Sequence, residues 1–290
     1  MTKKRILYRL GFLGITILFI PLLPILIIFL GVSSPEYVIY GTLDLSTNQS
    51  YSAWELYASF LKHIILFDFG TSTSSGQPVL SEVFSALGSS FAIIGIAIVL
   101  SYVFGTIAGL LSTRYNLFEK IWTKTEFLFY IPMIVFSYLV LYLLDRLGID
   151  FLSDVRYLFA GMILSIYPFY IVSKSIYKTL HRLKESDLFI CHRSYGFSDG
   201  EIWKTFCKRY IIIDYLSFLE NLIIFMFGFI FFVETPFGIN GVGQKFVIAI
   251  QRFDYPVIIG FCIFSIILFS IIGIISEWVK VVIDPRVIND

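Results

Sequence analysis

The sequence has few charged side chains: only 15% of its 290 residues are Asp, Glu, Lys or Arg, whereas 57% are hydrophobic. A soluble domain of this size usually carries charges at about a quarter of its positions. The charges also stand together in short stretches, separated by long uncharged tracts, which is the pattern that a lipid bilayer imposes. The composition therefore argues against an ordinary soluble domain and predicts a membrane protein.

Further absences exclude several classes of function. The three cysteines and three histidines show no metal-type spacing, so neither a disulfide framework nor a resident metal ion is expected. The chain contains no glycine-rich phosphate loop of the Walker type, so it cannot hydrolyse ATP itself. Candidate catalytic Ser, His and acidic residues are spread over both sides of the predicted membrane, which argues against an enzyme. We therefore expect no catalytic residue and no cofactor in this chain.

Six uncharged tracts are long enough, or nearly long enough, to cross a bilayer. A membrane-spanning helix needs about 20 apolar residues, because each adds ~1.5 Å and the hydrocarbon core is about 30 Å thick. Backbone groups in lipid must satisfy one another, so the tracts are predicted to be helices. We therefore expect an all-α membrane protein, with residues 1–290 forming one transmembrane domain. Its six transmembrane helices are predicted at residues 10–30, 83–111, 122–144, 157–178, 214–233 and 255–280.

The basic residues predict the orientation of these spans. An even number of crossings places both termini on one side, and that side holds 17 of the 22 Lys and Arg residues. Because loops rich in Lys and Arg stay in the cytoplasm, both termini are predicted to be cytoplasmic. Two loops are too long to be simple turns: residues 31–81 on the outside, and residues 181–213 inside, between spans four and five.

The long cytoplasmic loop carries signals for two short helices. Asp187 favours a helix start, where its carboxylate meets the positive end of the helix dipole. Gly196 suits the left-handed conformation that ends a helix. Ser198 and Glu201 form a capping box, so a second helix is expected to begin there. The loop is therefore predicted to fold as a helix, a glycine and a helix.

This loop also carries several large apolar side chains that we expect to be available on its surface: Phe189, Ile190, Tyr195, Phe197 and Trp203. Such side chains either pack on the ends of the membrane helices or fill a groove on another protein. For the first helix, contact with a partner is the favoured interpretation. For the second helix, packing on the bundle is at least as well supported.

The spacing of Asp187, nine residues before Gly196, resembles the coupling loop of ABC importer permeases. The resemblance is to the dipeptide, oligopeptide and nickel transporter family, and in particular to its first-permease or B-type subunit. Further segments are similar to that family, in the same order and on the predicted sides. They are residues 68–72 and 76–79, 233–243, 254–256 and 284–286.

The resemblance implies a permease subunit in the cytoplasmic (inner) membrane of a bacterium or archaeon. It implies a second homologous permease, separate ATPase subunits that hold ATP and Mg, and an extracytoplasmic substrate-binding protein as partners, with no role for nucleic acid. The residues expected to dock the ATPase are Asp187, Phe189, Ile190, Tyr195, Gly196, Phe197 and Trp203. The cargo stays open among dipeptides, oligopeptides, metal chelates and other small solutes.

Two carboxylates in or at the end of the fifth span are candidates for the translocation path or outer gate. Glu220 lies inside the span, where a carboxylate is costly and usually faces the bundle interior or a wet cavity. The alternative is a hydrated position near the headgroups. Glu234 ends the span. It is expected to act in an outer gate or in docking the binding protein, or else to be a hydrated span terminus.

A different class of transporter remains as an alternative. An ion-driven or passive polytopic carrier would need no ATPase partner, and the cytoplasmic loop distinguishes the two classes. The glycines at positions 238, 241 and 243 do not form a nucleotide loop, because no strand precedes them, and we expect them to form a tight re-entrant turn.

Overall fold

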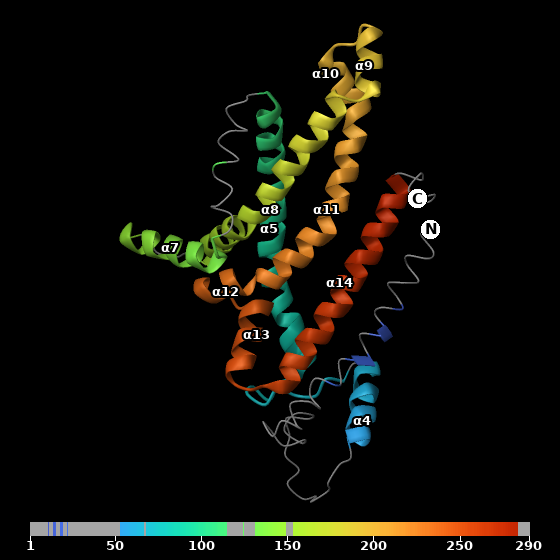
Figure 1. Cartoon of the computed structure of the whole chain (residues 1–290). Helices are drawn as coiled ribbons and strands as arrows, with labels where there is room; N and C mark the ends of the chain where they lie inside the picture. Colours follow the sequence, from blue (N-terminus) through green and yellow to red (C-terminus); the bar gives the residue numbers. More distant parts are fainter. Residues whose placement is uncertain are drawn as a thin grey trace, which may run out of the picture. The chain divides into compact units, whose positions relative to one another are not determined.

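The computed structural model describes residues 53–66, 68–114, 131–148 and 153–283, with isolated positions at 11, 14, 15, 18, 19, 22 and 124. The chain divides into two compact units. One comprises residues 1–90 with 240–277, and the other comprises residues 91–239 with 278–290. Within the described ranges the chain is helical and contains no strand beyond an isolated bridge between Thr71 and Pro78 (Figure 1). This confirms the expected all-α class.

Four of the helices are long and apolar enough to cross a membrane. They correspond to the second, fourth, fifth and sixth predicted spans, and each is longer than the apolar tract that predicted it. The four helices are α5 (Val79–Arg114), α8 (Ser153–Lys184), α11 (Lys208–Phe229) and α14 (Tyr255–Ile283).

The other two predicted spans, the first and the third, are not described as full-length membrane helices. Residues 10–30 lie outside the described residues apart from isolated positions. For the third span, the described helix is α7 (Met133–Arg146), whose 14 residues extend about 21 Å, less than the hydrocarbon core. It begins after Pro132, whose ring has no N–H to continue a helix toward the N-terminus. The count of six spans and the cytoplasmic position of the termini stay predictions.

Three shorter helices lie in segments that the sequence assigned to loops or span ends. Helix α4 (Ala53–Ile65) occupies part of the long loop at 31–81. Helix α12 (Phe231–Phe237) follows α11 and ends at Gly238, which has the left-handed φ of 60°. Helix α13 (Val242–Gln251) then begins after Gly241. Gly238 and Gly241 therefore stand in a turn between two helices, whereas Gly243 lies inside α13; a re-entrant position of this turn stays a prediction.

In the unit of residues 91–239, two glycines let helix α5 approach α8 closely. A Cβ built on Gly105 would lie 2.9 Å from a methyl group of Val172, and one on Gly109 would lie 2.8 Å from the Cβ of Ile176. The Cβ built on Gly109 would also lie 2.9 Å from the carbonyl oxygen of Ser173. Small residues at four-residue spacing allow such contact between membrane helices. Helices α8 and α11 also pack on each other in this unit (Figure 1).

Replacing Gly109 by alanine is therefore expected to destabilise the protein by about 1–3 kcal/mol, because the added methyl group meets backbone as well as side-chain atoms. Thermal unfolding of the purified protein in detergent measures the effect. Gly95 on the same helix is the matched control, since a Cβ there meets nothing within 4 Å. Equal unfolding temperatures for Gly109→Ala and Gly95→Ala would contradict the close approach.

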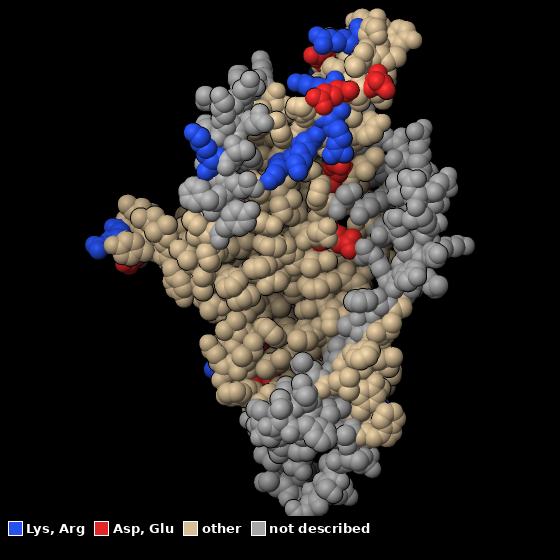
Figure 2. Space-filling model, in the orientation of Figure 1, with Lys and Arg blue, Asp and Glu red and all other residues tan. Residues whose placement is uncertain are grey.

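Helix α8 is longer than a bilayer is thick. Its 32 residues extend about 48 Å, against about 30 Å of hydrocarbon. Its last turn carries His181, Arg182 and Lys184. Figure 2 shows Lys and Arg side chains, together with several Asp and Glu, gathered around α9, α10 and the adjoining ends of α8 and α11. The basic C-terminal turn of α8 is therefore typical of a helix that extends beyond the membrane.

Candidate functional site

The first candidate site is the helix pair, residues 186–203, which lies at the ends of α8 and α11 (Figure 1). Its first helix, α9, spans Asp187–Ser194, and its second, α10, spans Asp199–Ile202. The hydroxyl of Ser186 caps α9 by accepting a hydrogen bond from the amide of Phe189, and Asp187 stands in the first turn. A carboxylate there is favoured by the helix dipole.

The turn between the two helices follows the predicted chemistry. Gly196 adopts a left-handed φ of 87°. The Ser198 hydroxyl accepts from the amide of Glu201, while the Glu201 carboxylate accepts from the Ser198 amide at 2.8 Å. Hydrogen bonds from the Ser198 hydroxyl and amide hold the pKa of Glu201 below its ordinary value. The helix, glycine, helix prediction is therefore confirmed.

The interior of the helix pair is apolar. Phe189 and Ile202 are buried against each other, and Leu183 and Trp203 pack on them. The rings of Phe189 and Trp203 lie 5.5 Å apart. Phe189 was expected on the surface but is buried, because its position on α9 faces α10. Its side chain, and much of that of Trp203, holds the two helices together.

The opposite face of the pair exposes the remaining predicted residues. Tyr195 is 77% exposed, Ile190 58% and Phe197 43%. Asp187 and Gly196 are exposed beside them. Several large apolar side chains exposed within eight residues of the chain indicate an interaction surface. We call these residues, Asp187, Ile190, Tyr195, Gly196 and Phe197, the exposed face of the helix pair.

The helix pair continues into helix α11 without a break. Helix α10 runs into a five-residue π-helical turn, Trp203–Cys207, and from there directly into α11, whereas the sequence suggested a separate helix. The Thr179 hydroxyl of α8 donates to the carboxylate of Asp214 on α11. The hydroxyl of Tyr102 on α5 donates to the carbonyl of Tyr215 at 2.9 Å. A displacement of the pair would therefore reach α8, α11 and α5 together.

The second candidate site lies in the unit that contains residues 1–90 and 240–277. Asp254 precedes α14, is 1% exposed, and accepts four hydrogen bonds from three consecutive residues of the turn before α5. The hydroxyls of Ser72 and Ser74 donate at 2.6 and 2.9 Å, and the amides of Thr73 and Ser74 each donate at 3.2 Å. We call this arrangement the Asp254 latch.

The hydrogen bonds of the latch also decide the charge of Asp254. Burial alone would raise its pKa, but the donors of Ser72, Ser74 and Thr73 outweigh burial and hold the pKa of Asp254 below its ordinary value. A carboxylate that accepts several hydrogen bonds is stabilised in its ionised form. Asp254 is therefore charged at neutral pH.

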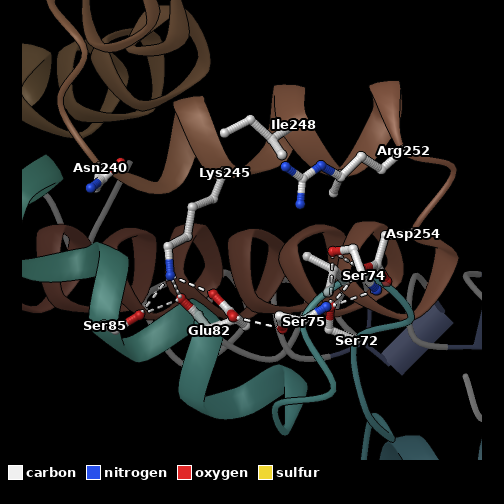
Figure 3. A pocket seen from close by; sticks show the side chains of 12 residues that line it. Ser72, Ser74, Ser75, Glu82, Ser85, Asn240, Lys245, Ile248, Arg252 and Asp254 are labelled. Carbon is white, nitrogen blue, oxygen red and sulfur yellow. Dashed lines mark hydrogen bonds and ion pairs between the residues drawn. The ribbon is translucent and has the colours of Figure 1, made fainter.

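A pocket of about 410 Å³ lies beside the latch (Figure 3). Across it, the ammonium group of Lys245 on α13 contacts the Glu82 carboxylate at 2.5 Å and the Ser85 hydroxyl at 2.8 Å. Ser75 also donates to Glu82, at 2.9 Å. The full lining is Ser72, Ser74, Ser75, Glu82, Ser85, Asn240, Lys245, Ile248, Ala249, Arg252, Asp254 and Val257.

The two candidate carboxylates of the translocation path are both buried. Glu220 on α11 is 9% exposed, and Glu234 on α12 is fully enclosed. A hydrated span terminus, one of the interpretations of Glu234, does not fit a side chain with no exposed surface. The structure keeps these residues apart from the helix pair, so they form no common site with it.

Sequence reasoning missed the pocket and the latch. The latch joins residues more than 170 positions apart, so no local pattern reports it. A signal was nevertheless present, because residues 68–72 and 254–256 were both singled out as family-like segments. The hydrogen bond between these two segments explains why both are important for the fold.

Together, a set of long apolar helices and a polar helix pair with an exposed apolar face define a multi-pass membrane protein that offers a docking surface to another molecule. Residues 121–289 match the family model described as "Binding-protein-dependent transport system inner membrane component". Because the match covers more than half of the chain, the protein belongs to this family. It is a multi-pass protein of the bacterial inner membrane, and the family's members are membrane permeases rather than enzymes.

Two relatives carry a more specific name. The chain is 25% identical over 243 residues to the dipeptide transport system permease protein DppB of Lactococcus lactis subsp. cremoris, covering 81% of this chain and 80% of the relative. It is 23% identical over 241 residues to the DppB protein of Bacillus subtilis, covering 80% of this chain and 78% of that relative.

Proposed function

We propose that this chain is one of two membrane subunits of an ATP-driven importer for peptides. Membership of the binding-protein-dependent transport family and two relatives named as dipeptide permeases support the class and the cargo. The observation that carries the ATP-driven part is the exposed face of the helix pair, where Tyr195 and Ile190 are more than half exposed. Apolar side chains of this size in solvent call for a protein partner.

In this proposal, the helix pair lies in the cytoplasm and seats in a separate ATPase subunit, which holds ATP and Mg. Closure of the ATPase subunits on ATP displaces the pair. The direct connection of α10 to α11, and the Thr179–Asp214 hydrogen bond to α8, carry that displacement into the long helices. The membrane subunits then alternate between inward and outward access by movement of packed helix groups.

A second permease would complete the translocation path, and an extracytoplasmic binding protein would deliver the peptide to the opposite side. The distribution of Lys and Arg along the sequence supports this orientation, with both termini in the cytoplasm. A metal chelate is the alternative cargo. An ion-driven or passive carrier is the alternative class, and it leaves the exposed face of the helix pair without a purpose.

The proposal is tested by purifying the tagged chain from its native membrane in mild detergent. Mass spectrometry of the purified material then identifies the co-purifying subunits and any bound ligand. We expect an ATP-binding-cassette ATPase, a second permease and a peptide. Recovery of the chain without any nucleotide-hydrolysing subunit, under conditions in which it still transports, would establish the carrier alternative instead.

Replacing Glu220 by glutamine tests whether this buried carboxylate contacts the cargo. If Glu220 lines the path and pairs with the amino group of a peptide, loss of its charge is expected to lower uptake by about tenfold at a fixed peptide concentration, since one charge-assisted hydrogen bond is lost. Uptake of a labelled dipeptide into proteoliposomes measures the effect. Unchanged rate and substrate preference would remove Glu220 from the path.

A further inference from the structure

The C-terminal part of helix α8 has two stripes of opposite character. One is buried in the unit of residues 91–239, where it packs against side chains of α5 and α11, and it comprises Val172, Ile176 and Leu180. The other consists of cations that each follow a buried residue by two positions, namely Lys174, Lys178 and Arg182. We call these three cations the basic stripe of α8. Two positions correspond to about 200° around a helix, so the basic stripe faces away from α5 and α11.

The outer two cations of the basic stripe are open to the surroundings. Lys178 and Arg182 are both exposed. Lys174 is half-buried beside Tyr170, because its ammonium group donates to the hydroxyl of that residue at 2.7 Å and lies 5.0 Å from the centre of the ring. Figure 2 shows Lys and Arg side chains gathered at this end of α8. The stripe therefore presents positive charge on the outside of the unit.

This charge is not neutralised by the part of the chain that the structure describes. Among those residues, no carboxylate forms an ion pair with Lys178 or Arg182. Glu185 is close in sequence, but its carboxylate lies 3.4 Å from the imidazole of His181 instead. An anionic group from outside the chain would therefore be attracted to the basic stripe.

The position of the stripe along α8 predicts its depth in the membrane. The uncharged part of the helix covers residues 157–173. If the middle of this tract lies at the bilayer centre, the hydrocarbon core of about 30 Å ends close to Lys174. Lys178 then stands about 4–5 Å beyond the hydrocarbon, in the layer of lipid headgroups. Arg182 lies one turn further, and its long side chain can reach back to that layer.

The surroundings of the stripe differ from those of a protein interface. Within residues 163–189, all of which the structure describes, no large apolar side chain is exposed. Protein interfaces have an apolar centre with aromatic residues, and lysine is depleted there. The exposed face of the helix pair has such apolar side chains, whereas the basic stripe offers cations alone. Its chemistry suits a phosphate group better than a protein surface.

We propose that the basic stripe of α8 binds the phosphate headgroup of an anionic phospholipid. Lysine and arginine donate charge-assisted hydrogen bonds to phosphate oxygens, and basic groups at the ends of membrane helices attract anionic lipids. The lipid would belong to the leaflet in which the C-terminal end of α8 lies. This inference goes beyond the proposed function and does not depend on an ATPase partner, because a carrier of any class would meet the same lipids.

The test measures lipid binding by the tagged chain, purified in detergent with the subunits that accompany it and freed of native lipid. Native mass spectrometry counts the bound lipids while phosphatidylglycerol, or in parallel phosphatidylcholine, is added. The double variant Lys178→Ala/Arg182→Ala removes two cations and keeps a high helix propensity. Lys184→Ala is the matched control, since Lys184 is an exposed cation two positions after Arg182 and so lies on the other side of the helix.

We expect the wild type to bind phosphatidylglycerol at least about tenfold more tightly than phosphatidylcholine, because the headgroup of the first lipid carries a net negative charge. The double variant is expected to lose at least about tenfold in affinity for phosphatidylglycerol, whereas Lys184→Ala stays within about twofold of the wild type. Phosphatidylglycerol is also expected to raise the unfolding temperature of the wild type and not that of the double variant. Without lipid, the two should unfold at the same temperature.

Equal affinity of the wild type and the double variant for phosphatidylglycerol would overturn the inference, and so would equal affinities of the wild type for the two lipids. If soluble glycerol phosphate at a similar concentration stabilises the wild type as much as phosphatidylglycerol does, the stripe binds a soluble phosphate instead. Loss of a co-purifying subunit from the double variant would assign the stripe to a protein interface.

Discussion

Replacing Tyr195 by aspartate is expected to abolish the association of the chain with the ATPase subunit that we propose as its partner. Tyr195 is the most exposed of the large apolar side chains of the exposed face. Loss of an aromatic anchor typically costs about 2–4 kcal/mol in an interface, and an added unpaired charge increases that cost. Affinity purification of the tagged chain, followed by quantification of the ATPase subunit and of ATP hydrolysis, measures the effect.

Two controls separate docking from folding in this experiment. Tyr195→Phe keeps the ring and is expected to keep the association. Trp54→Asp introduces the same charge at another highly exposed aromatic residue, on α4, and is expected to leave the ATPase bound. If Tyr195→Asp retains a normal amount of ATPase, the helix pair is not the docking site, and the carrier alternative gains support.

Replacing Asp254 by alanine is expected to destabilise the unit that holds the pocket by about 3–5 kcal/mol. The substitution removes the acceptor for four hydrogen bonds and leaves the buried Ser72 hydroxyl and its neighbours without their partner. Thermal unfolding gives the overall loss. Hydrogen exchange of the amides of Thr73 and Ser74 reports the local loss, and both amides are expected to exchange faster.

The same residue predicts a dependence of stability on pH. Because the folded-state pKa of Asp254 lies below its ordinary value, its charge contributes stability at neutral pH. This contribution is lost as the pH falls below about 4 and through the folded-state pKa. Asp254→Ala must lack this component. If wild type and variant lose stability in parallel between neutral pH and pH 3, the latch does not hold the turn.

The parts of the fold that the sequence predicted are those governed by local chemistry. Gly196 and the Ser198–Glu201 capping box specify a turn and a helix start within a few residues, and the structure has both. Long uncharged tracts specify helices, and four of the predicted spans are present. The exposure of Phe189 was mispredicted because helical spacing does not reveal which face of α9 meets α10.

The parts that escaped prediction depend on distant residues. Nothing in residues 72–74 indicates that their donors meet Asp254, and nothing in α13 alone indicates that its last turn borders a pocket. Helix α4 was missed because its polar residues interrupt any apolar tract, although its apolar residues fall on one side of a helix. The first predicted span lies outside the described residues, and the third is only partly within them.

The length of α8 has a consequence for how the proposed ATPase partner would reach the helix pair. If its apolar part is centred in about 30 Å of hydrocarbon, about two turns at its basic end extend beyond the hydrocarbon. A protein that receives Tyr195 and Ile190 would then reach them without pressing against the headgroups. Its binding cavity would then be able to surround the helix pair, and a force applied there would act at the end of the long helix α8.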